Sequence, residues 1–318
     1  MKAEMTPKVL FIGGYGRSGS TLLDRVLGRV DGFFSAGEVR HLWIEGLVEG
    51  RRCGCGVPVP DCPVWQEILE EAFGSDGIDV SELLHLRAKV DRFFRIPQFV
   101  TGLPRSFGRD VERYARLVGR LYRAIAVVTG ASVIVDSSKD VSHGWLLTRV
   151  KEIDLHVVQL VRDSRATAYS WRRKKFNPGS GRNMDSWGIV RSALEWSAIN
   201  SLTHLMRHTR RPFSVVRYED LAAWPAGTVS RVLSFVGEGD SDLPVSADGG
   251  VELDTDHTVA GNPLRFDNGA IRIRPDVDWV QDMGRVDKAL VGLLTYPSLH
   301  RYGFDLRPAG AEGVGSAR

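Results

Sequence analysis

The sequence lacks a hydrophobic run of the length that crosses a membrane. A spanning helix needs about 20 consecutive apolar residues, and no uninterrupted run in the chain approaches that length. The segment from Met1 to Lys8 also lacks the apolar core of a signal peptide. We therefore expect a cytoplasmic protein without stable membrane insertion.

Charge of one sign is not in excess either. The 42 Lys and Arg residues face 39 Asp and Glu residues, which leaves a formal net charge of +3. This near balance excludes the clustered positive surface of a dedicated nucleic-acid-binding protein. The basic run at 171–176 is expected to be a solvated helix end that raises the local positive potential for an anionic ligand.

Cysteine is scarce, and all three cysteines, Cys53, Cys55 and Cys62, lie in one segment rich in Gly and Pro. Three thiolates at this spacing could begin a zinc site, but His41 and His85 are only distant candidates for a fourth ligand. We therefore expect no metal, and instead a turn with reduced cysteines or one labile disulfide.

Four short runs rich in β-branched residues predict buried strands, at 8–13, 132–136, 155–161 and 213–217. Helical patterns follow them at 19–30, 140–150, 163–175 and 228–236. Strands that alternate with helices predict an α/β fold with a parallel sheet flanked by helices. Ligands of such sheets bind at the carboxyl ends of the strands.

The long stretch between the first two predicted strands has helical periodicity at 64–73, 80–94 and 109–128. It is too long for a simple crossover, so we expect a helical insertion over residues 40–130 that forms a lid over the site. The 318 residues otherwise suit a single domain, which we expect to cover 1–306. The Gly- and Ala-rich tail at 307–318 is predicted to be disordered.

A glycine-rich loop at 13–19 follows the first predicted strand and opens a helix, a combination that binds anions through backbone N–H groups and the positive helix end. Gly14, Gly16 and Gly19 match the G-x-G-x-x-G dinucleotide fingerprint. Glu38 lies nineteen residues beyond Gly19, where a ribose-binding acid is expected. An NAD(P)-dependent Rossmann oxidoreductase is therefore one interpretation.

The same loop also matches a Walker A sequence in which Ser20 replaces the lysine. The β- and γ-phosphates lose their main counter-charge without that lysine, which disfavours a P-loop nucleotide hydrolase or kinase. A cation inside the loop, Arg17, suits a single terminal 5′-phosphate whose negative charge grows during transfer.

Residues 17–23 resemble the 5′-phosphosulfate-binding loop of the sulfotransferases that use 3′-phosphoadenosine 5′-phosphosulfate (PAPS). Residues 160–170 are similar to the family's 3′-phosphate motif, with Arg162 at a strand end and Ser170 eight residues later. The resemblance implies that the 5′ end of the donor is held by Arg17, Ser18, Gly19, Ser20 and Thr21.

Two later segments extend the resemblance. Residues 216–221 resemble the segment whose tyrosine lies near the nucleotide, which implies a cofactor contact for Tyr218. Residues 261–266 resemble the loop that returns an arginine to the 3′-phosphate and an aromatic ring to the adenine. This implies that Arg265 and Phe266 also bind PAPS.

The resemblance also implies catalytic roles. Glu38 lies twenty-one residues after Arg17, as in the tyrosylprotein and Golgi branches, whose glutamate acts as the base. Lys139 and Arg17 are expected to stabilise charge on the sulfonate and the leaving phosphate, and Arg40 to contact the acceptor. A histidine base, His41 or His143, stays open as an alternative.

Together these features predict a bacterial PAPS-dependent sulfotransferase with a P-loop-like parallel sheet. It transfers a sulfonate to a hydroxyl or an amine of a small-molecule, carbohydrate or lipid acceptor by in-line displacement. The products are the sulfonated acceptor and adenosine 3′,5′-bisphosphate, and neither a metal nor a nucleic-acid partner is expected. A non-catalytic nucleotide-binding protein is a further alternative.

Overall fold

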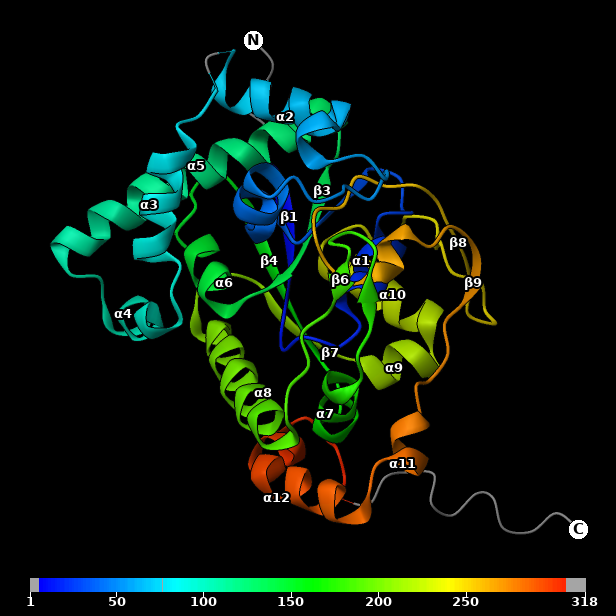
Figure 1. Ribbon diagram of the computed structural model, residues 1–318. Coiled ribbons are helices and arrows are strands. Elements are labelled where there is room, and N and C mark those ends of the chain that lie inside the picture. The colour runs from blue at the N-terminus through cyan, green and yellow to red at the C-terminus, as the bar shows by residue number, and fades with distance from the viewer. Residues whose placement is uncertain (1–5, 76, 307–318) are drawn as a thin grey trace, which may run out of the picture.

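A five-stranded parallel sheet forms the centre of the molecule (Figure 1). The computed structural model describes residues 6–75 and 77–306, and the strand order is β2-β3-β1-β4-β7. The strands are β1 (Lys8–Gly13), β2 (Phe33–Gly37), β3 (Val133–Lys139), β4 (Asp154–Val161) and β7 (Phe213–Arg217). All neighbouring pairs run parallel, so their carboxyl ends meet at one edge. The predicted α/β class is confirmed, and β2 is a strand that the sequence did not reveal.

Side chains of β1 alternate between two hydrophobic cores, one on each face of the sheet. Val9 and Phe11 lie in the core that α5 and α6 cover, whereas Leu10 and Ile12 lie in the core that α1 and α10 cover. The four helices are α1 (Ser20–Leu27), α5 (Arg105–Thr129), α6 (Val141–Leu147) and α10 (Pro225–Phe235). Because helices cover both faces, the carboxyl edge of the sheet is left for a ligand.

The segment between β2 and β3 is largely helical, as predicted. It contains η1 (Val39–His41), the π-helical turn η2 (Leu42–Val48), η3 (Val59–Asp61), α2 (Pro63–Phe73), α3 (Val80–Val90), η4 (Phe93–Arg95), α4 (Ile96–Thr101) and α5. Buried Trp65, Leu83 and Tyr114 join these helices to the core around Phe11. Helices α2 to α5 lie at the upper left of Figure 1, away from β8 and β9. The insertion is therefore packed onto the sheet.

The remaining elements follow β4 and complete the edge where the strands end. They are α7 (Ser164–Arg172), β5 (Phe176–Asn177), β6 (Arg182–Asn183), α8 (Ile189–His204), η5 (Leu205–His208), α9 (Tyr218–Ala223), β8 (Gly250–Leu253), η6 (Pro263–Phe266), β9 (Gly269–Arg272), α11 (Asp278–Asp282) and α12 (Arg285–Arg301). The pairs β5–β6 and β8–β9 are antiparallel. Two short hairpins thus accompany the central sheet.

The helices of the described ranges are all too short or too polar to traverse a lipid bilayer. The tail predicted at 307–318 lies outside the described residues.

Candidate active site

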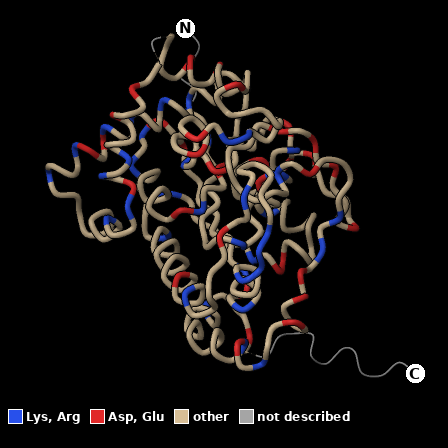
Figure 2. Tube along the Cα trace, viewed as in Figure 1, with Lys and Arg blue, Asp and Glu red and all other residues tan. Residues whose placement is uncertain are grey.

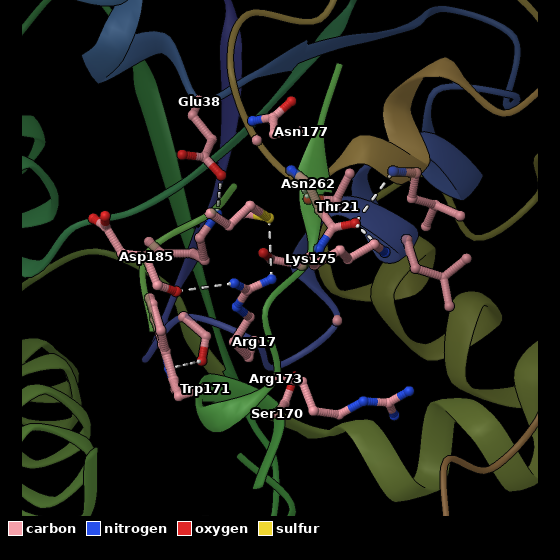
Figure 3. A pocket seen from close by; sticks show the side chains of 18 of the residues that line it. Arg17, Thr21, Glu38, Ser170, Trp171, Arg173, Lys175, Asn177, Asp185 and Asn262 are labelled. Atoms are coloured by element: carbon pink, nitrogen blue, oxygen red, sulfur yellow. Dashed lines mark hydrogen bonds and ion pairs between the residues drawn. The ribbon is translucent and has the colours of Figure 1, made fainter. Parts of the chain in front are cut away.

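A cavity of 830 Å³ lies at the carboxyl edge of the sheet (Figure 3). Each of the five parallel strands delivers one lining residue to it at or just beyond its carboxyl end. In sheet order these residues are Glu38 after β2, Lys139 at the end of β3, Arg17 after β1, Arg162 after β4 and Tyr218 after β7. The volume is in the range of pockets that enclose a small molecule. Residues far apart in the sequence therefore meet in one site.

The loop after β1 requires glycine at two positions. Gly14 has a φ of +130°, and a Cβ there would lie 2.4 Å from the carbonyl oxygen of Leu160. Gly19 has a φ of +92°, and a Cβ there would lie 2.6 Å from the ring of Tyr218. Only glycine adopts such conformations without strain. The tight turn brings Ser20, the first residue of α1, to the cavity wall, where the first N–H groups of the helix have no intrahelical partner.

Arg17 is held by an aromatic ring, a sulfur atom and a backbone oxygen. Its guanidinium lies over the ring of Trp171, 4.9 Å from the ring centroid, and Nη1 lies 3.2 Å from Sδ of Met184. Burial lowers the pKa of Arg17, yet an arginine stays protonated. No carboxylate within ion-pair distance of Arg17 is found in the described residues. Its Nε and the neighbouring Ser18 Oγ are buried without a hydrogen-bond partner there. These groups fit a bound anion.

Glu38 and Lys139 form an ion pair in the lining of the cavity. Nζ of Lys139 donates to Oε1 of Glu38 and, at 2.9 Å, to the carbonyl oxygen of Ser137. Lys139 has a φ of +63°, an uncommon conformation that turns its side chain back from the end of β3. Both side chains are largely buried. The pair combines a proton acceptor and a cation within one small volume.

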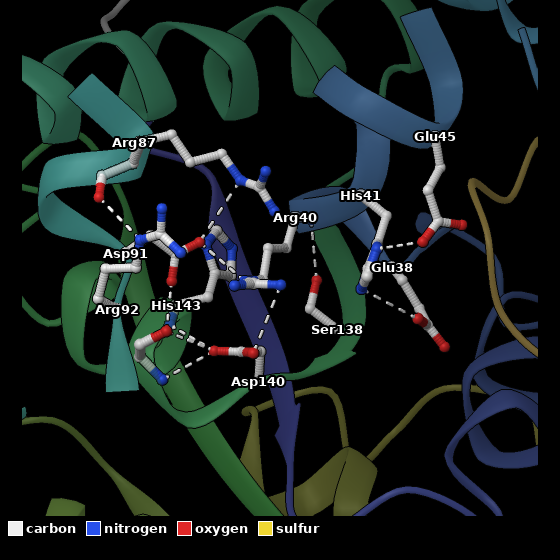
Figure 4. Close-up of polar contacts among 12 residues, drawn as sticks. Glu38, Arg40, His41, Glu45, Arg87, Asp91, Arg92, Ser138, Asp140 and His143 are labelled. Carbon is white, nitrogen blue, oxygen red and sulfur yellow. Dashed lines mark hydrogen bonds and ion pairs between the residues drawn. The ribbon is translucent and has the colours of Figure 1, made fainter. Parts of the chain in front are cut away.

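His41 lies behind Glu38, outside the cavity lining. Its Nε2 is 3.6 Å from Oε2 of Glu38, and its Nδ1 is 2.6 Å from Oε1 of Glu45 (Figure 4). The other histidine considered from the sequence, His143, is buried, with Nε2 3.3 Å from Oδ2 of Asp136. Among the three candidate bases, only Glu38 lines the cavity.

Arg162 is a further cation of the cavity lining. We call Arg17 and Arg162 the first and second cationic corners of the cavity. Nη1 of Arg162 donates to the carbonyl oxygen of Arg17 at 3.2 Å, so the two corners are adjacent. Its Nη2 lies 2.8 Å from Oδ2 of Asp276, and its guanidinium lies over the ring of Tyr218, 4.6 Å from the ring centroid. Nε of Arg162 is buried without a partner in the described part of the chain. Ser170 lines the same cavity from α7.

Three residues that the sequence associated with substrates do not line the cavity. Arg40 donates through Nε to Oδ2 of Asp91 at 2.7 Å (Figure 4). Arg265 is buried, lies over the ring of Phe266, and donates to the carbonyl oxygens of Thr258 and Arg52. In this structure Arg265 contacts Arg52, the ring of Phe266 lies beside Gly179, and the residues of the 261–266 loop that line the cavity are Gly261, Asn262 and Leu264.

Positive charge reaches the cavity from a segment that the sequence assigned to a solvated helix end. The end of α7 and the turn after it contribute Arg173, Lys174 and Lys175 to the lining, and β6 contributes Arg182. Figure 2 shows Lys and Arg gathered where α7 leads into β5. Burial lowers the pKa of Lys175. The sequence does not show that the basic run at 171–176 turns toward the cavity, or that Asp276 joins its lining. Both depend on the direction that the fold imposes on these segments.

The insertion contributes little to this wall. Of its residues, Glu45 and Arg51 line the cavity, and helices α2 to α5 do not. Within the described residues, the part of the insertion that borders the cavity is the η2 turn and the segment after it. The helices of the insertion pack onto the sheet.

Comparison with known proteins assigns a family to part of the chain. Residues 137–245, which include Lys139, Arg162, Ser170 and Tyr218, match the sulfotransferase domain. No curated protein matches the sequence at a significant level.

Solved structures show the same fold. The sulfotransferase domain from the curacin biosynthetic pathway has 16% identity, covers 95% of this chain and 99% of that domain, and has a TM-score of 0.50. The sulfotransferase domain from the Synechococcus PCC 7002 olefin synthase has 16% identity, coverages of 95% and 96%, and a TM-score of 0.47. Sulfotransferase STF9 from Mycobacterium avium has 12% identity, coverages of 96% and 79%, and a TM-score of 0.47. The segment at 137–245 is therefore similar to a sulfotransferase domain, and the chain shares the fold of the sulfotransferase domain from the curacin biosynthetic pathway.

Proposed function

We propose that this enzyme transfers a sulfonate group from PAPS to a hydroxyl group of a polar acceptor, with Glu38 as the base. The observation that carries the proposal is the convergence of Arg17, Glu38, Lys139 and Arg162 on one cavity at the carboxyl edge of the sheet. A cation, a carboxylate and a second cation are the groups that sulfonate transfer requires.

The walls of the cavity suit a doubly phosphorylated nucleotide. The N–H groups at the start of α1, the buried Ser18 hydroxyl and Arg17 would hold the 5′ end. Arg162 and Ser170 would hold the 3′-phosphate, beside Tyr218. The unpartnered Nε atoms of Arg17 and Arg162 support this fit. Arg162 must exchange its Asp276 carboxylate for the phosphate when the donor binds.

The chemistry of the proposed step balances with these groups. PAPS supplies the sulfonate when it is bound. Glu38 accepts the proton of the acceptor hydroxyl as the acceptor oxygen bonds to sulfur, and the bond from sulfur to the 5′-phosphate oxygen breaks. The electron pair of that bond leaves on adenosine 3′,5′-bisphosphate. Arg17 and Lys139 stabilise the negative charge that develops on the transferring oxygens and on the leaving phosphate.

The remaining lining residues favour a polar acceptor. The lining includes Met184 and several charged and amide side chains that the donor does not use, namely Glu45, Arg51, Asn177, Arg182, Asn183 and Asp185. Burial of an aliphatic chain against such groups would cost free energy because their hydrogen bonds to water would be lost. A carbohydrate or another polyhydroxylated small molecule therefore fits better than a lipid chain, and an amine could accept the sulfonate by the same proton transfer.

The test is to incubate the protein with sulfur-labelled PAPS and a panel of sugars, nucleosides and natural-product alcohols. We expect labelled acceptor and an equal amount of adenosine 3′,5′-bisphosphate. Calorimetry with adenosine 3′,5′-bisphosphate, NAD and ATP separates the alternatives, since only the first should bind tightly. Tight binding of NAD or ATP alone would overturn the proposal, and donor binding without turnover on the panel would favour a non-catalytic role.

A further inference from the structure

A second cluster of reactive side chains lies outside the cavity and contains all three cysteines together with His257. Sγ of Cys62 lies 3.2 Å from Nδ1 of His257, and Sγ of Cys53 lies 3.9 Å from the same atom. Sγ of Cys55 lies 3.7 Å from Sγ of Cys62. All four atoms lie within 4.8 Å of one another. His257 could not be recognised as the fourth member from the sequence, because it lies 195 positions beyond Cys62.

Three of these separations, 3.2, 3.7 and 3.9 Å, are close to the edges of a metal-centred tetrahedron. Zinc bonds of about 2.3 Å to sulfur and about 2.0 Å to nitrogen put neighbouring ligand atoms about 3.5 to 3.8 Å apart. A disulfide, in contrast, needs sulfur atoms about 2.05 Å apart, and the three cysteines are free. Three sulfurs and one imidazole nitrogen form one of the common ligand sets of structural zinc.

We propose that Cys53, Cys55, Cys62 and His257 bind one zinc ion in a closed, four-coordinate structural site. The proposal differs from the expectation from the sequence, which was that the cysteines bind no metal because no fourth ligand stands beside them. Thiolate ligands select zinc over the hard cations magnesium and calcium, which prefer oxygen.

Hydrogen bonds hold the ligands in place in the absence of an ion. The backbone N–H of Cys53 donates to the carbonyl oxygen of Val57 at 2.7 Å, and that of Gly54 donates to Thr258 at 3.0 Å. Nε1 of Trp65 donates to the carbonyl oxygen of His257 at 2.7 Å. A side chain at Gly54 would lie 2.1 Å from Oδ1 of Asp256, so this close approach requires glycine. The site is thus built before metal binds, and metal binding would join the 53–62 loop to the 256–258 segment.

The ion would also stabilise the segment that positions Glu38. Two residues after His257, Val259 accepts the N–H of Glu38 at 2.7 Å and donates to the carbonyl oxygen of Ala36 at 3.0 Å. Arg265 bridges the same two segments through the carbonyl oxygens of Arg52 and Thr258. This explains why Arg265 is buried here instead of in the cavity. The zinc ligands are therefore positioning residues for the end of β2.

Zinc binding must displace protons from the thiols. Each thiolate that coordinates releases its proton to solvent, and His257 coordinates through neutral Nδ1. Metal affinity should therefore rise with pH.

The experiment is metal analysis of the full chain, purified without added chelator and with reductant present. We expect about one zinc per chain, as a closed four-ligand site requires. His257→Gln and Cys55→Ser should lose most of this zinc. His85→Gln is the matched control, because His85 is exposed and lies outside the cluster, and it should retain the metal.

A second measurement on the unmodified chain avoids variants that fail to fold. After removal of the metal, cobalt(II) should produce the visible absorption of a tetrahedral thiolate complex, and one equivalent of zinc should abolish it. Three thiols should react with a thiol reagent in the metal-free chain, and far more slowly when zinc is present. Absence of stoichiometric metal together with no cobalt spectrum, equal zinc loss in His85→Gln, or a disulfide found by mass spectrometry would each overturn the proposal. None of these readouts depends on sulfonate transfer.

Discussion

The two cationic corners of the cavity differ in what neutralises them. Arg17 lies over Trp171 and has no carboxylate partner in the described residues, whereas Arg162 carries the carboxylate of Asp276. Glu38 and Lys139 lie on the side of Arg17, and Tyr218 lies beneath Arg162. The difference indicates two tasks: the first corner serves the reacting group, and the second holds a ligand anion in exchange for a protein carboxylate. Variants at the first corner should therefore lower turnover, and variants at the second should change donor affinity.

The largest effect is expected at the proposed base. Glu38→Gln keeps the shape of the side chain but removes its capacity to accept a proton, so kcat should fall by about 10²- to 10⁴-fold. The affinity for adenosine 3′,5′-bisphosphate, measured by calorimetry, should change little. Glu82→Gln is the control, because Glu82 is partly exposed, pairs with Arg113 and does not line the cavity. Unchanged turnover in Glu38→Gln would place the base elsewhere.

Loss of the cation at the first corner should have the next largest effect. Arg17→Met preserves the apolar contact with Trp171 but removes the charge that faces the leaving phosphate, so kcat should fall by about 10²- to 10³-fold. Arg173→Met removes another cation of the cavity lining and should cost much less. Equal losses in the two variants would mean that only the overall positive potential matters.

A variant at the second corner should weaken the binding of the donor. Arg162→Met removes charged hydrogen bonds to the 3′-phosphate and should weaken the binding of adenosine 3′,5′-bisphosphate by about 10- to 100-fold. The same variant should bind adenosine 5′-phosphosulfate, which has no 3′-phosphate, about as well as the unmodified enzyme does. If both nucleotides lose affinity equally, Arg162 does not recognise the 3′-phosphate.

The smallest effect is expected from a change at Asp276, whose carboxylate pairs with Arg162 and would be replaced by the phosphate of the donor. Asp276→Asn removes the competing charge 2.8 Å from Nη2 of Arg162, so donor affinity should rise by roughly threefold, since a partly exposed ion pair contributes little free energy. Asp278→Asn is the control, because Asp278 is exposed and pairs with Arg173. Weaker donor binding in Asp276→Asn would show that Asp276 orients Arg162 instead of competing with the ligand.

The local hydrophobic pattern of the sequence was enough to predict most strands of the sheet. The strands around Leu10, Val135 and Leu160 are rich in buried apolar residues, because a parallel strand inside the sheet is covered on both faces, whereas β7 at the edge is only partly buried. Strand β2 was missed since its five residues include Ser35 and Gly37 and lie at the sheet edge. Its existence explains the place of Glu38, which directly follows β2 and so reaches the same edge as the other strand ends.

The glycine loop and the arginine at the end of β4 could be identified because their function depends on a short, continuous segment. Gly14 and Gly19 are needed for the turn itself, and Arg162 follows directly from the strand. Arg265 could not be placed in this way, since its guanidinium could turn toward the cavity or toward Arg52 from the same loop. The neighbours supplied by the fold decided between the two directions.

By itself, the sequence determined the α/β class, the glycine-rich turn after the first strand and the kinds of charge that the cavity contains. These properties follow from hydrophobic periodicity and from residues adjacent in the chain. Only the tertiary structure decided which charges face each other: it paired Glu38 with Lys139 and Arg162 with Asp276, and it brought His257 to the cysteines. The reason is that such contacts depend on the packing of distant segments, and no local rule of sequence specifies the direction in which a long side chain points.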